Sequence, residues 1–241
     1  VEIELSTGLN SKPYVDMTLA IMRDFGITVE RDGYQSFKIP ANRYSPIPNY
    51  PIESDASAAS YFLAAAALTA GRVTVEGLGK RSSQGDVNFV NVLAQMGCKI
   101  EQDEHNSTVI GPPIGTLKGV DVDLNEMPDT AQTLAVLALF ATGPTNVRNV
   151  ANLRIKETDR IAAVATELTK LGARVEQRDD GFRVIPPASP RPAAIDTYDD
   201  HRMAMSFALA GLRLDGVVIN DAQCVSKTFP EFFEVFESMK S

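Results

Sequence analysis

The string KETDRIA at residues 156–162 places two cations and two carboxylates at the start of an expected helix. Acidic residues favour the positive end of a helix dipole, but Lys156 and Arg160 gain nothing there. Lys156 and Arg160 are four residues apart, which predicts that they share one helical face. We therefore expect Lys156, Glu157 and Arg160 to serve a ligand rather than the helix itself.

More cations occur near the starts of other expected elements. Arg154 precedes the KETDRIA string, Arg202 follows His201 in the first turn of an expected helix, and Lys227 follows a short expected strand. Four or five cations converging on helix N-termini form the pattern of a pocket for a polyanion. Phosphate and carboxylate groups are its natural ligands.

Three aspartates begin apolar helices, and their interpretation differs. Asp55 and Asp200 are interpreted as helix caps, which accept backbone N–H groups. Asp129 lies in NEMPDTAQT, before a helix with no cation of its own, so that a cap and a functional carboxylate both remain open for it. A structural and a functional role are likewise both open for His201, whereas His105 is expected to be solvated.

The elements around these residues recur. Asp55, Asp129 and Asp200 are spaced by 74 and 71 residues, and each begins an almost wholly apolar helix followed by a glycine and a β-branched strand. Amphipathic helices alternate with these, with apolar residues three or four apart. Each amphipathic helix ends in a glycine suited to a left-handed C-terminal residue. These glycines are Gly26, Gly97 and Gly172.

The repeat predicts an α/β fold with threefold pseudo-symmetry. A unit of this kind cannot bury its apolar helix alone, so we expect the inner helices to bundle centrally, with sheets and amphipathic helices outside. The Pro-rich stretch YSPIPNYPIES at residues 44–54 predicts a linker. We expect residues 1–52 to be the tail of an incomplete N-terminal lobe and residues 53–241 to form the C-terminal lobe.

Composition narrows the class of protein. The net charge of −8 gives no basic field for nucleic acid, and no apolar run reaches the roughly 18 residues of a membrane span. The two cysteines, Cys98 and Cys224, lack the spacing of a metal site and are interpreted as two buried thiols in a reducing compartment. No signal peptide is recognised, so we expect a cytoplasmic location. The start at Val1, within an expected strand, suggests a piece of a longer protein.

Four strings carry a resemblance to a known family: SDASAASYFLAAAA, NLRIKETDRIA, DDHRMAMSFAL and SKTFPEFF. They resemble 5-enolpyruvylshikimate-3-phosphate (EPSP) synthases over essentially all 241 residues, which correspond to the C-terminal part of the family's length. The resemblance implies an enolpyruvyl transferase-like fold of two lobes, each with three βαβαββ units. It also implies transfer of the carboxyvinyl group of phosphoenolpyruvate (PEP) to the 5-hydroxyl of shikimate 3-phosphate, with competition between PEP and glyphosate. No metal or organic cofactor is implied, and the whole enzyme is expected to be a monomer.

The resemblance also implies roles for individual residues. Asp129 is the base on the hydroxyl, Glu157 is the acid at C3 of PEP, and Lys156 contacts the reacting hydroxyl and relays its proton. The remaining contacts are assigned by substrate. Shikimate 3-phosphate is expected at Ser11, Tyr14, Asp129, Asn152 and Lys156, and PEP at Arg160, His201, Arg202 and Lys227.

Three expectations complete the hypothesis. Because nearby cations lower carboxylate pKa values, Glu157 becomes a useful acid only when substrates are bound. The missing N-terminal lobe carries further binding groups, so this chain alone is expected to be inactive, with its cation face exposed and residues 1–52 poorly docked. The rivals are a UDP-N-acetylglucosamine enolpyruvyl transferase, disfavoured by Ser11–Tyr14 and KETDR, and a binding module that has lost catalysis, disfavoured by the presence of Asp129 and Glu157.

Overall fold

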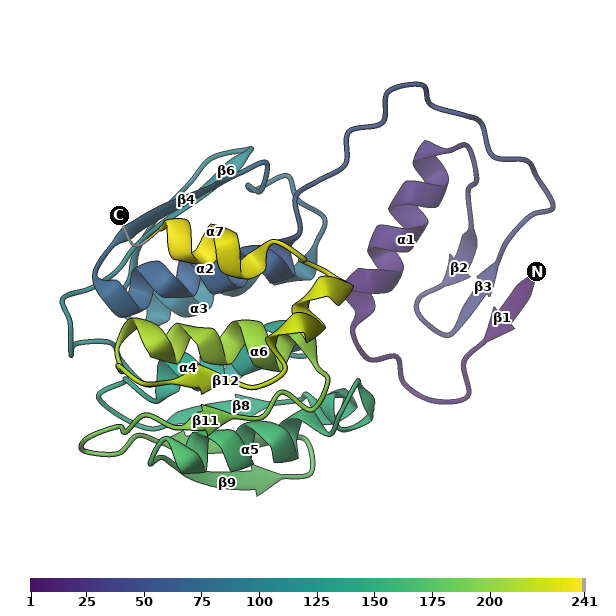
Figure 1. The fold of residues 1–241 in the computed structure, drawn as a ribbon. Helices are drawn as coiled ribbons and strands as arrows, with labels where there is room; N and C mark the ends of the chain where they lie inside the picture. The colour runs from purple at the N-terminus through teal and green to yellow at the C-terminus, as the bar shows by residue number, and fades with distance from the viewer. Residues whose placement is uncertain (240–241) are drawn as a thin grey trace.

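The computed structural model describes residues 1–239, in a small N-terminal part and a larger C-terminal part (Figure 1). The N-terminal part is one helix beside an antiparallel sheet of order β1-β3-β2. Its elements are β1 (Glu2–Glu4), α1 (Lys12–Asp24), β2 (Glu30–Asp32) and β3 (Ser36–Lys38). No helix or strand lies between β3 and Ala56, which agrees with the Pro-rich stretch predicted as a linker.

The C-terminal part consists of three related units. The elements of the first unit are α2 (Ala56–Thr69), β4 (Arg72–Glu76), η1 (Gly85–Asn88), α3 (Phe89–Gln95), β5 (Lys99–Gln102) and β6 (Asn106–Ile110). Those of the second are β7 (Asp121–Asp123), η2 (Pro128–Thr130), α4 (Ala131–Ala138), β8 (Thr145–Arg148), η3 (Ala151–Ile155), α5 (Arg160–Lys170), β9 (Arg174–Arg178) and β10 (Gly181–Ile185). Those of the third are β11 (Ala194–Ile195), α6 (His201–Ala208), η4 (Leu209–Leu212), β12 (Val218–Ile219), η5 (Ala222–Lys227) and α7 (Phe232–Ser238).

The second unit is the most complete copy of the predicted βαβαββ pattern. Its sheet has the order β7-β8-β10-β9, with β7 parallel to β8 and the other pairs antiparallel. The first unit forms the sheet β4-β6-β5 without a leading parallel strand in residues 1–239. The third pairs β11 with β12 in parallel, and within the described chain no strand pair follows α7. The repeat is therefore real but not equally complete in its three copies.

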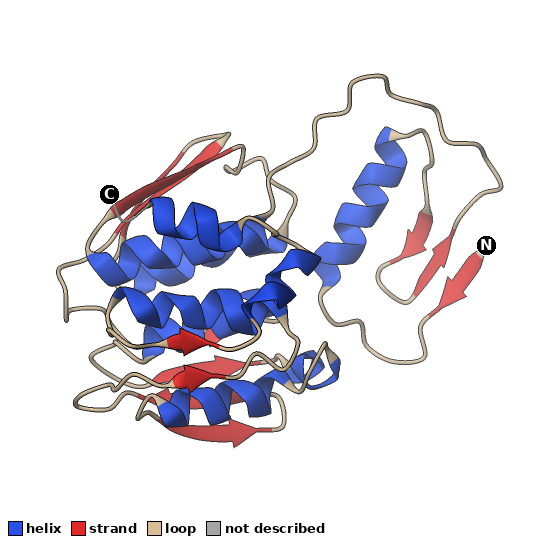
Figure 2. Ribbon diagram, in the orientation of Figure 1, coloured by secondary structure: helices blue, strands red, loops and turns tan. Residues whose placement is uncertain are grey.

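The apolar helices form the predicted inner bundle. Figure 2 shows strands on both outer sides of a central group of helices. All eight residues of α4 are buried, as an all-round apolar surface requires. Where α2, α4 and α6 meet, the hydroxyls of Ser60, Thr133 and Ser206 form a chain with steps of 3.2 and 3.3 Å, which satisfies their buried oxygens. These helices are short, and in residues 1–239 no helix has the length and apolar character needed to cross a membrane.

The amphipathic helix α5 has the predicted outer position. Ile161, Val164 and Leu168 are buried on one face, whereas Thr166 on the opposite face is exposed. Gly172 follows the helix with φ +101°, a left-handed conformation that glycine adopts without steric cost. This rigid helix fixes the position of its first residue, Arg160.

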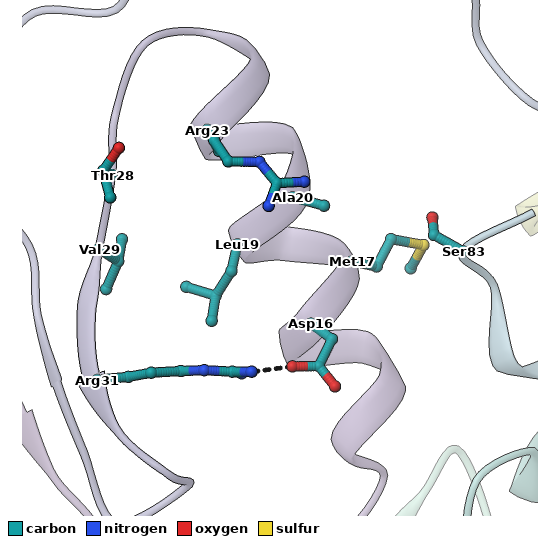
Figure 3. A pocket seen from close by; sticks show the side chains of 9 residues that line it. All are labelled: Asp16, Met17, Leu19, Ala20, Arg23, Thr28, Val29, Arg31 and Ser83. Atoms are coloured by element: carbon teal, nitrogen blue, oxygen red, sulfur yellow. Dashed lines mark hydrogen bonds and ion pairs between the residues drawn. The ribbon is translucent and has the colours of Figure 1, made fainter.

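The N-terminal part contacts the C-terminal part through the beginning of α1. No residue of α1 is buried, and a groove of about 410 Å³ opens between α1 and residues 28–31 (Figure 3). The ion pair between Arg31 Nη1 and Asp16 Oδ1, 2.5 Å long, spans this groove. Near the start of α1, Ser11 and Tyr14 reach side chains of the C-terminal part. That residues 1–52 belong to a second lobe stays a prediction.

Candidate active site

Arg160 is the centre of a cluster of charged side chains. It is the first residue of α5, with only 1% of its surface exposed, and Asp159 caps the helix by accepting from the Ala162 N–H at 3.0 Å. The guanidinium donates from Nε to Asp200 Oδ2 at 2.7 Å and from Nη1 to Asp129 Oδ1 at 2.9 Å. Its Nη2 donates to Glu157 Oε2 at 2.6 Å. One buried cation thus holds three carboxylates from three parts of the sequence.

Asp129 is surrounded by cations. It lies within η2 and makes no capping bond, because the residue at the N-cap position is Met127. Arg202 Nη2 is 3.0 Å from its Oδ2, and Lys156 Nζ is 3.8 Å from its Oδ1. Burial favours the neutral acid, but the charges of Arg202, Arg160 and Lys156 outweigh it and hold the pKa of Asp129 below its ordinary value. Asp129 is therefore an ionised carboxylate at neutral pH.

Glu157 connects this cluster to its more exposed side. Its Oε1 accepts from Lys227 Nζ at 2.5 Å and lies 3.9 Å from His201 Nδ1. Burial again opposes ionisation, but the hydrogen bond from Lys227 and the charges of Arg160 and Lys227 lower the pKa of Glu157 to about 2. This agrees with the expectation that Glu157 is a poor acid without a bound ligand.

His201 and Arg202 enter the cluster from the first turn of α6. Asp200 caps this helix by accepting from the Arg202 N–H at 2.9 Å, while its two oxygens also bind Arg160. His201 is 2% exposed, and its Nδ1 has no hydrogen-bond partner. Burial and the neighbouring charge of Arg202 lower the pKa of His201, so this imidazole is neutral at pH 7.

Three polar residues predicted to bind one substrate also meet here. The Asn152 side-chain amide donates to Ser11 Oγ at 3.0 Å, across 141 residues of sequence. The Tyr14 hydroxyl donates to Asp129 Oδ2 at 3.3 Å, and burial together with the charges of Asp86 and Asp129 raises the pKa of Tyr14. Tyr14 is consequently a hydrogen-bond donor beside Asp129 at neutral pH.

The structure brings every predicted site residue to one region, but it corrects some details. Lys156 and Glu157 do not lie on a helix, because Asp159 captures the first free N–H and starts α5 at Arg160. The prediction that Lys156 and Arg160 share a helical face is therefore wrong, although both approach Asp129. Arg154 leaves the site and binds Asp159 and the backbone oxygens of residues 178 and 179.

The exposure of the cations also differs from expectation. Arg160 is enclosed and the Arg202 side chain is 14% exposed, whereas those of Lys156 and Lys227 are 33% and 56% exposed. The expectation of an exposed cation face is thus wrong for both arginines, whose charges are held by buried carboxylates. The two lysines are therefore the more accessible cations of the cluster.

Sequence reasoning missed two acidic residues. Asp200 was interpreted as a cap, yet it is also the bidentate partner of Arg160. For the string SSQGD at residues 82–86 the sequence favours an outer-helix cap over a phosphate loop, yet Asp86 lies within η1, is buried, accepts from the Ser57 hydroxyl and leaves Oδ1 without a partner. The equivalence of Asp200 and Asp129 in the repeat could have revealed the first role, whereas nothing in the sequence around Asp86 signals its burial.

No metal site accompanies the cluster in residues 1–239, where no three His, Cys, Asp or Glu side chains are placed to hold an ion. Chemically, the arrangement offers three carboxylates, a neutral imidazole and four cations within one cluster. Such a set can bind an anionic ligand and transfer protons to and from it.

Comparison with known proteins gives a consistent result. Residues 2–236 match the family described as EPSP synthase (3-phosphoshikimate 1-carboxyvinyltransferase). The 3-phosphoshikimate 1-carboxyvinyltransferase of Photobacterium profundum is 52% identical over 96% of this chain and 54% of its own length. The chloroplastic enzyme of Arabidopsis thaliana is 50% identical over 98% of this chain and 47% of its own length. This chain spans about half the length of the curated relatives it matches.

Solved structures agree on the fold. The EPSP synthase of Acinetobacter baumannii is similar with a TM-score of 0.79 and 25% identity, covering 99% of this chain and 56% of that one. The enolpyruvyl transferase NikO of Streptomyces tendae gives a TM-score of 0.72 at 21% identity, covering 99% of this chain and 55% of that one. The latter likeness concerns the fold alone.

Proposed function

This chain belongs to the EPSP synthase family, and we propose that the longer protein transfers the carboxyvinyl group of PEP to the 5-hydroxyl of shikimate 3-phosphate, releasing phosphate. The observation that carries this proposal is the environment of Asp129. It is a buried, ionised carboxylate with Arg160, Arg202 and Lys156 around it and the Tyr14 hydroxyl beside it. An aspartate kept ionised among cations suits a base that works next to anionic substrates.

In the proposed addition step, Asp129 takes the proton of the 5-hydroxyl while the oxygen of that hydroxyl bonds to C2 of PEP. Glu157 gives a proton to C3, which turns the methylene carbon into a methyl group and leaves a tetrahedral ketal. In the elimination step the proton roles reverse: Glu157 takes a proton from the methyl group, the C2–O bond to phosphate breaks as Asp129 returns its proton to the leaving phosphate, and the carbon–carbon double bond re-forms. Lys156 contacts the reacting hydroxyl and relays its proton, consistent with its position 3.8 Å from Asp129.

Glu157 must gain a proton before it can act as the acid. Its pKa of about 2 arises largely from Lys227 and Arg160, both of which are proposed to bind PEP. When the carboxylate and phosphate of PEP take over these cations, their pull on Glu157 weakens and its pKa rises. Substrate binding and activation of the acid are thereby coupled.

The two substrates are proposed to occupy opposite sides of the Asp129–Glu157 pair. The arginine and lysine side suits PEP, which needs partners for a carboxylate and a phosphate. We assign to it Arg160, His201, Arg202 and Lys227. The side formed by Ser11, Tyr14, Asn152 and Lys156 offers hydroxyl, amide and ammonium groups, which suit the hydroxyls of shikimate 3-phosphate.

The remaining half of the family's length is proposed to belong to the working enzyme. Residues 1–52 would join it in one lobe, and residues 53–241 would form the other. Closure of the two lobes would complete the substrate contacts and exclude water. We therefore expect no phosphate release by the 241-residue chain alone and turnover when the other half is present. Activity in the rigorously purified chain would contradict the proposal that both halves are needed for turnover.

The test of the activity is an acceptor comparison in the whole protein. PEP is supplied with either shikimate 3-phosphate or UDP-N-acetylglucosamine, and released phosphate is measured. We expect release only with shikimate 3-phosphate. A folded whole protein that is inactive with it, or that uses the nucleotide sugar instead, overturns the proposal.

A further inference from the structure

Helix α5 holds the segment that leads into α6 at two points. Arg160 and Glu167 are seven residues apart, close to two helical turns, and therefore lie on the same side of α5. Arg160 binds both oxygens of Asp200. Glu167 accepts from the Asp196 N–H at 3.1 Å and from the Tyr198 hydroxyl at 2.6 Å. The segment 196–200 is thus fastened at its beginning and its end.

Glu167 is a buried carboxylate with a full set of partners. Its side chain has no exposed surface, and Lys170 Nζ lies 2.8 Å from Oε2. The same ammonium group lies 2.7 Å from Asp196 Oδ2, which ties the carboxylate to the segment a second time. A buried charge persists in a fold only where such partners compensate for its lost hydration.

The fastened segment has an uncommon backbone. Tyr198 and Asp199 have φ values of +57° and +55°, two consecutive left-handed residues that are not glycine. The Asp200 N–H closes the turn by donating to the Thr197 carbonyl at 2.9 Å. Residues in this conformation persist where the surrounding structure holds them, and such strain clusters at functional sites.

The turn ends where the site begins. Asp200 caps α6, and His201 and Arg202 are the first two residues of that helix. The directions of their side chains into the charged cluster therefore depend on the conformation of residues 196–199. Glu167 and Tyr198 themselves make no contact with Asp129, Glu157 or Lys227 in the hydrogen bonds and ion pairs of the described chain.

We propose that Glu167 and Tyr198 are positioning residues, which hold the 196–199 turn so that His201 and Arg202 face the anion site. The kinetic part of this inference rests on the proposed function. The turn leads to the residues assigned to PEP and not to Ser11 or Asn152. Loosening it should therefore impair use of PEP and spare use of shikimate 3-phosphate.

The first experiment is independent of activity and uses Tyr198→Phe, which removes one hydroxyl and keeps the ring. His201 and His105 are the two histidines of this chain, and their signals in the NMR spectrum of the whole protein are assigned by substituting each. Burial and the charges of Arg202 and Arg160 lower the pKa of His201, while those of Asp200 and Glu157 raise it. In Tyr198→Phe we expect this pKa to move toward its ordinary value, and the signal of exposed His105 serves as the internal reference.

Tyr50→Phe is the matched control. It also removes a tyrosine hydroxyl that binds an aspartate, Asp24 at 2.9 Å, but in the N-terminal part. We expect no change of the His201 titration in this variant. Glu167→Gln, which keeps one acceptor oxygen, should change the His201 titration in the same direction as Tyr198→Phe.

The second experiment separates the two substrates kinetically. Small misplacements of remote side chains can reduce rates by up to about a hundredfold, so we expect roughly a tenfold higher KM for PEP in Tyr198→Phe. The KM for shikimate 3-phosphate and all values for Tyr50→Phe should stay within about twofold. An unchanged His201 titration in both variants, or equal changes in the two KM values, overturns the inference. If the whole protein has no activity with these substrates, the proposed function fails. The His201 titration alone then decides whether Glu167 and Tyr198 are positioning residues.

Discussion

The outer helices of the first and second repeats begin at equivalent places but carry opposite charges there. In the second repeat, Arg160 begins α5 and binds Asp129 and Asp200. In the first repeat, Asp86 lies in η1 directly before α3, hydrogen-bonded to Ser57 and without a cation within ion-pair distance in residues 1–239. The repeat fixes where a side chain enters the centre of the fold, whereas the residue type decides whether a site forms there.

The two buried aspartates show the electrostatic result of this difference. Burial raises the pKa of Asp86 to about 6, because only the Ser57 hydroxyl and the more distant Arg202 oppose it. Asp129 is also buried, yet Arg202, Arg160 and Lys156 lower its pKa. Burial raises the pKa of both aspartates, and the cations supplied by the second and third repeats decide whether the net shift is upward or downward.

The largest expected effect is the loss of activity in Asp129→Asn of the whole protein. Asparagine keeps the shape but cannot accept the substrate proton, so turnover should fall by at least about a thousandfold, or about 4 kcal/mol of barrier. Asp55→Asn is the matched control at the equivalent helix start and should change turnover by less than about threefold. The measurement is phosphate release at saturating substrates. A fall of under tenfold in Asp129→Asn would remove Asp129 from the proposed base role.

Removing the central cation should have the next largest effect, on stability. Arg160→Met leaves Asp200, which has no exposed side-chain surface, without its bidentate partner. We expect a loss of about 3 to 4 kcal/mol in the free energy of unfolding, because a buried carboxylate is left unpaired. The loss is not larger because Lys156 and Arg202 still face Asp129. Urea denaturation of the whole protein measures it.

Lys227→Met is the control for this comparison. The Lys227 side chain is 56% exposed, and its partner Glu157 keeps the bond to Arg160. We expect a loss of under about 1 kcal/mol, as for other exposed ion pairs. Equal losses in the two variants would show that burial of Arg160 does not set its contribution.

The sequence predicts the repeat, the two kinds of helix and the members of the site. These depend on local properties: apolar residues recur along α4 and α5, and Gly172 marks the end of α5. Ion-pair partners are set by tertiary distances that no local pattern contains. Only the structure therefore shows that Arg160 binds Asp200, that Arg154 binds the backbone oxygen of residue 178, and that Glu167 binds Tyr198.

The start of α5 shows why local reasoning also fails at a boundary. Five residues lie between Arg154 and Arg160, and four of the residues from 156 to 160 are charged. The dense charge suggested one helical turn, but Asp159 outcompetes the other residues as the cap because its carboxylate reaches the Ala162 N–H. Lys156 and Glu157 then lie in the preceding loop, where they are free to approach Asp129 and Lys227.

A smaller effect, of opposite sign, is expected when Asp86 loses its charge. A carboxyl whose pKa is about 6 in the folded protein and about 4 when unfolded binds its proton more tightly when folded. Its ionisation destabilises the fold above pH 6, and this cost disappears as the pH falls below about 4. Asp86→Asn should therefore raise the free energy of unfolding by about 2 kcal/mol at pH 7.5, since the buried amide N–H₂ offsets part of the gain.

Urea denaturation of Asp86→Asn and of the unsubstituted protein at pH 7.5 and pH 4.5 tests this sign. The difference between the two proteins should shrink at the lower pH, while the contributions of Asp129 and Glu157 are common to both and cancel. Asp215→Asn, at an exposed turn, should stay within about 0.5 kcal/mol at either pH. A destabilised Asp86→Asn at pH 7.5 would mean that the charged form of Asp86 is the favoured one.

The smallest expected effect concerns Asp55, the counterpart of Asp129 at the start of α2. Its side chain accepts from the Ala58 N–H at 3.0 Å, and its surface is exposed. Asp55→Ala removes this cap and should lower the free energy of unfolding by about 1 kcal/mol, whereas Asp55→Asn should be nearly neutral because asparagine caps equally well. Thermal and urea unfolding of both variants measure the difference. A loss in Asp55→Asn as large as that in Asp55→Ala would mean that the charge of Asp55, and not its hydrogen bond, stabilises α2, and the contrast between the two helix starts would then be one of degree.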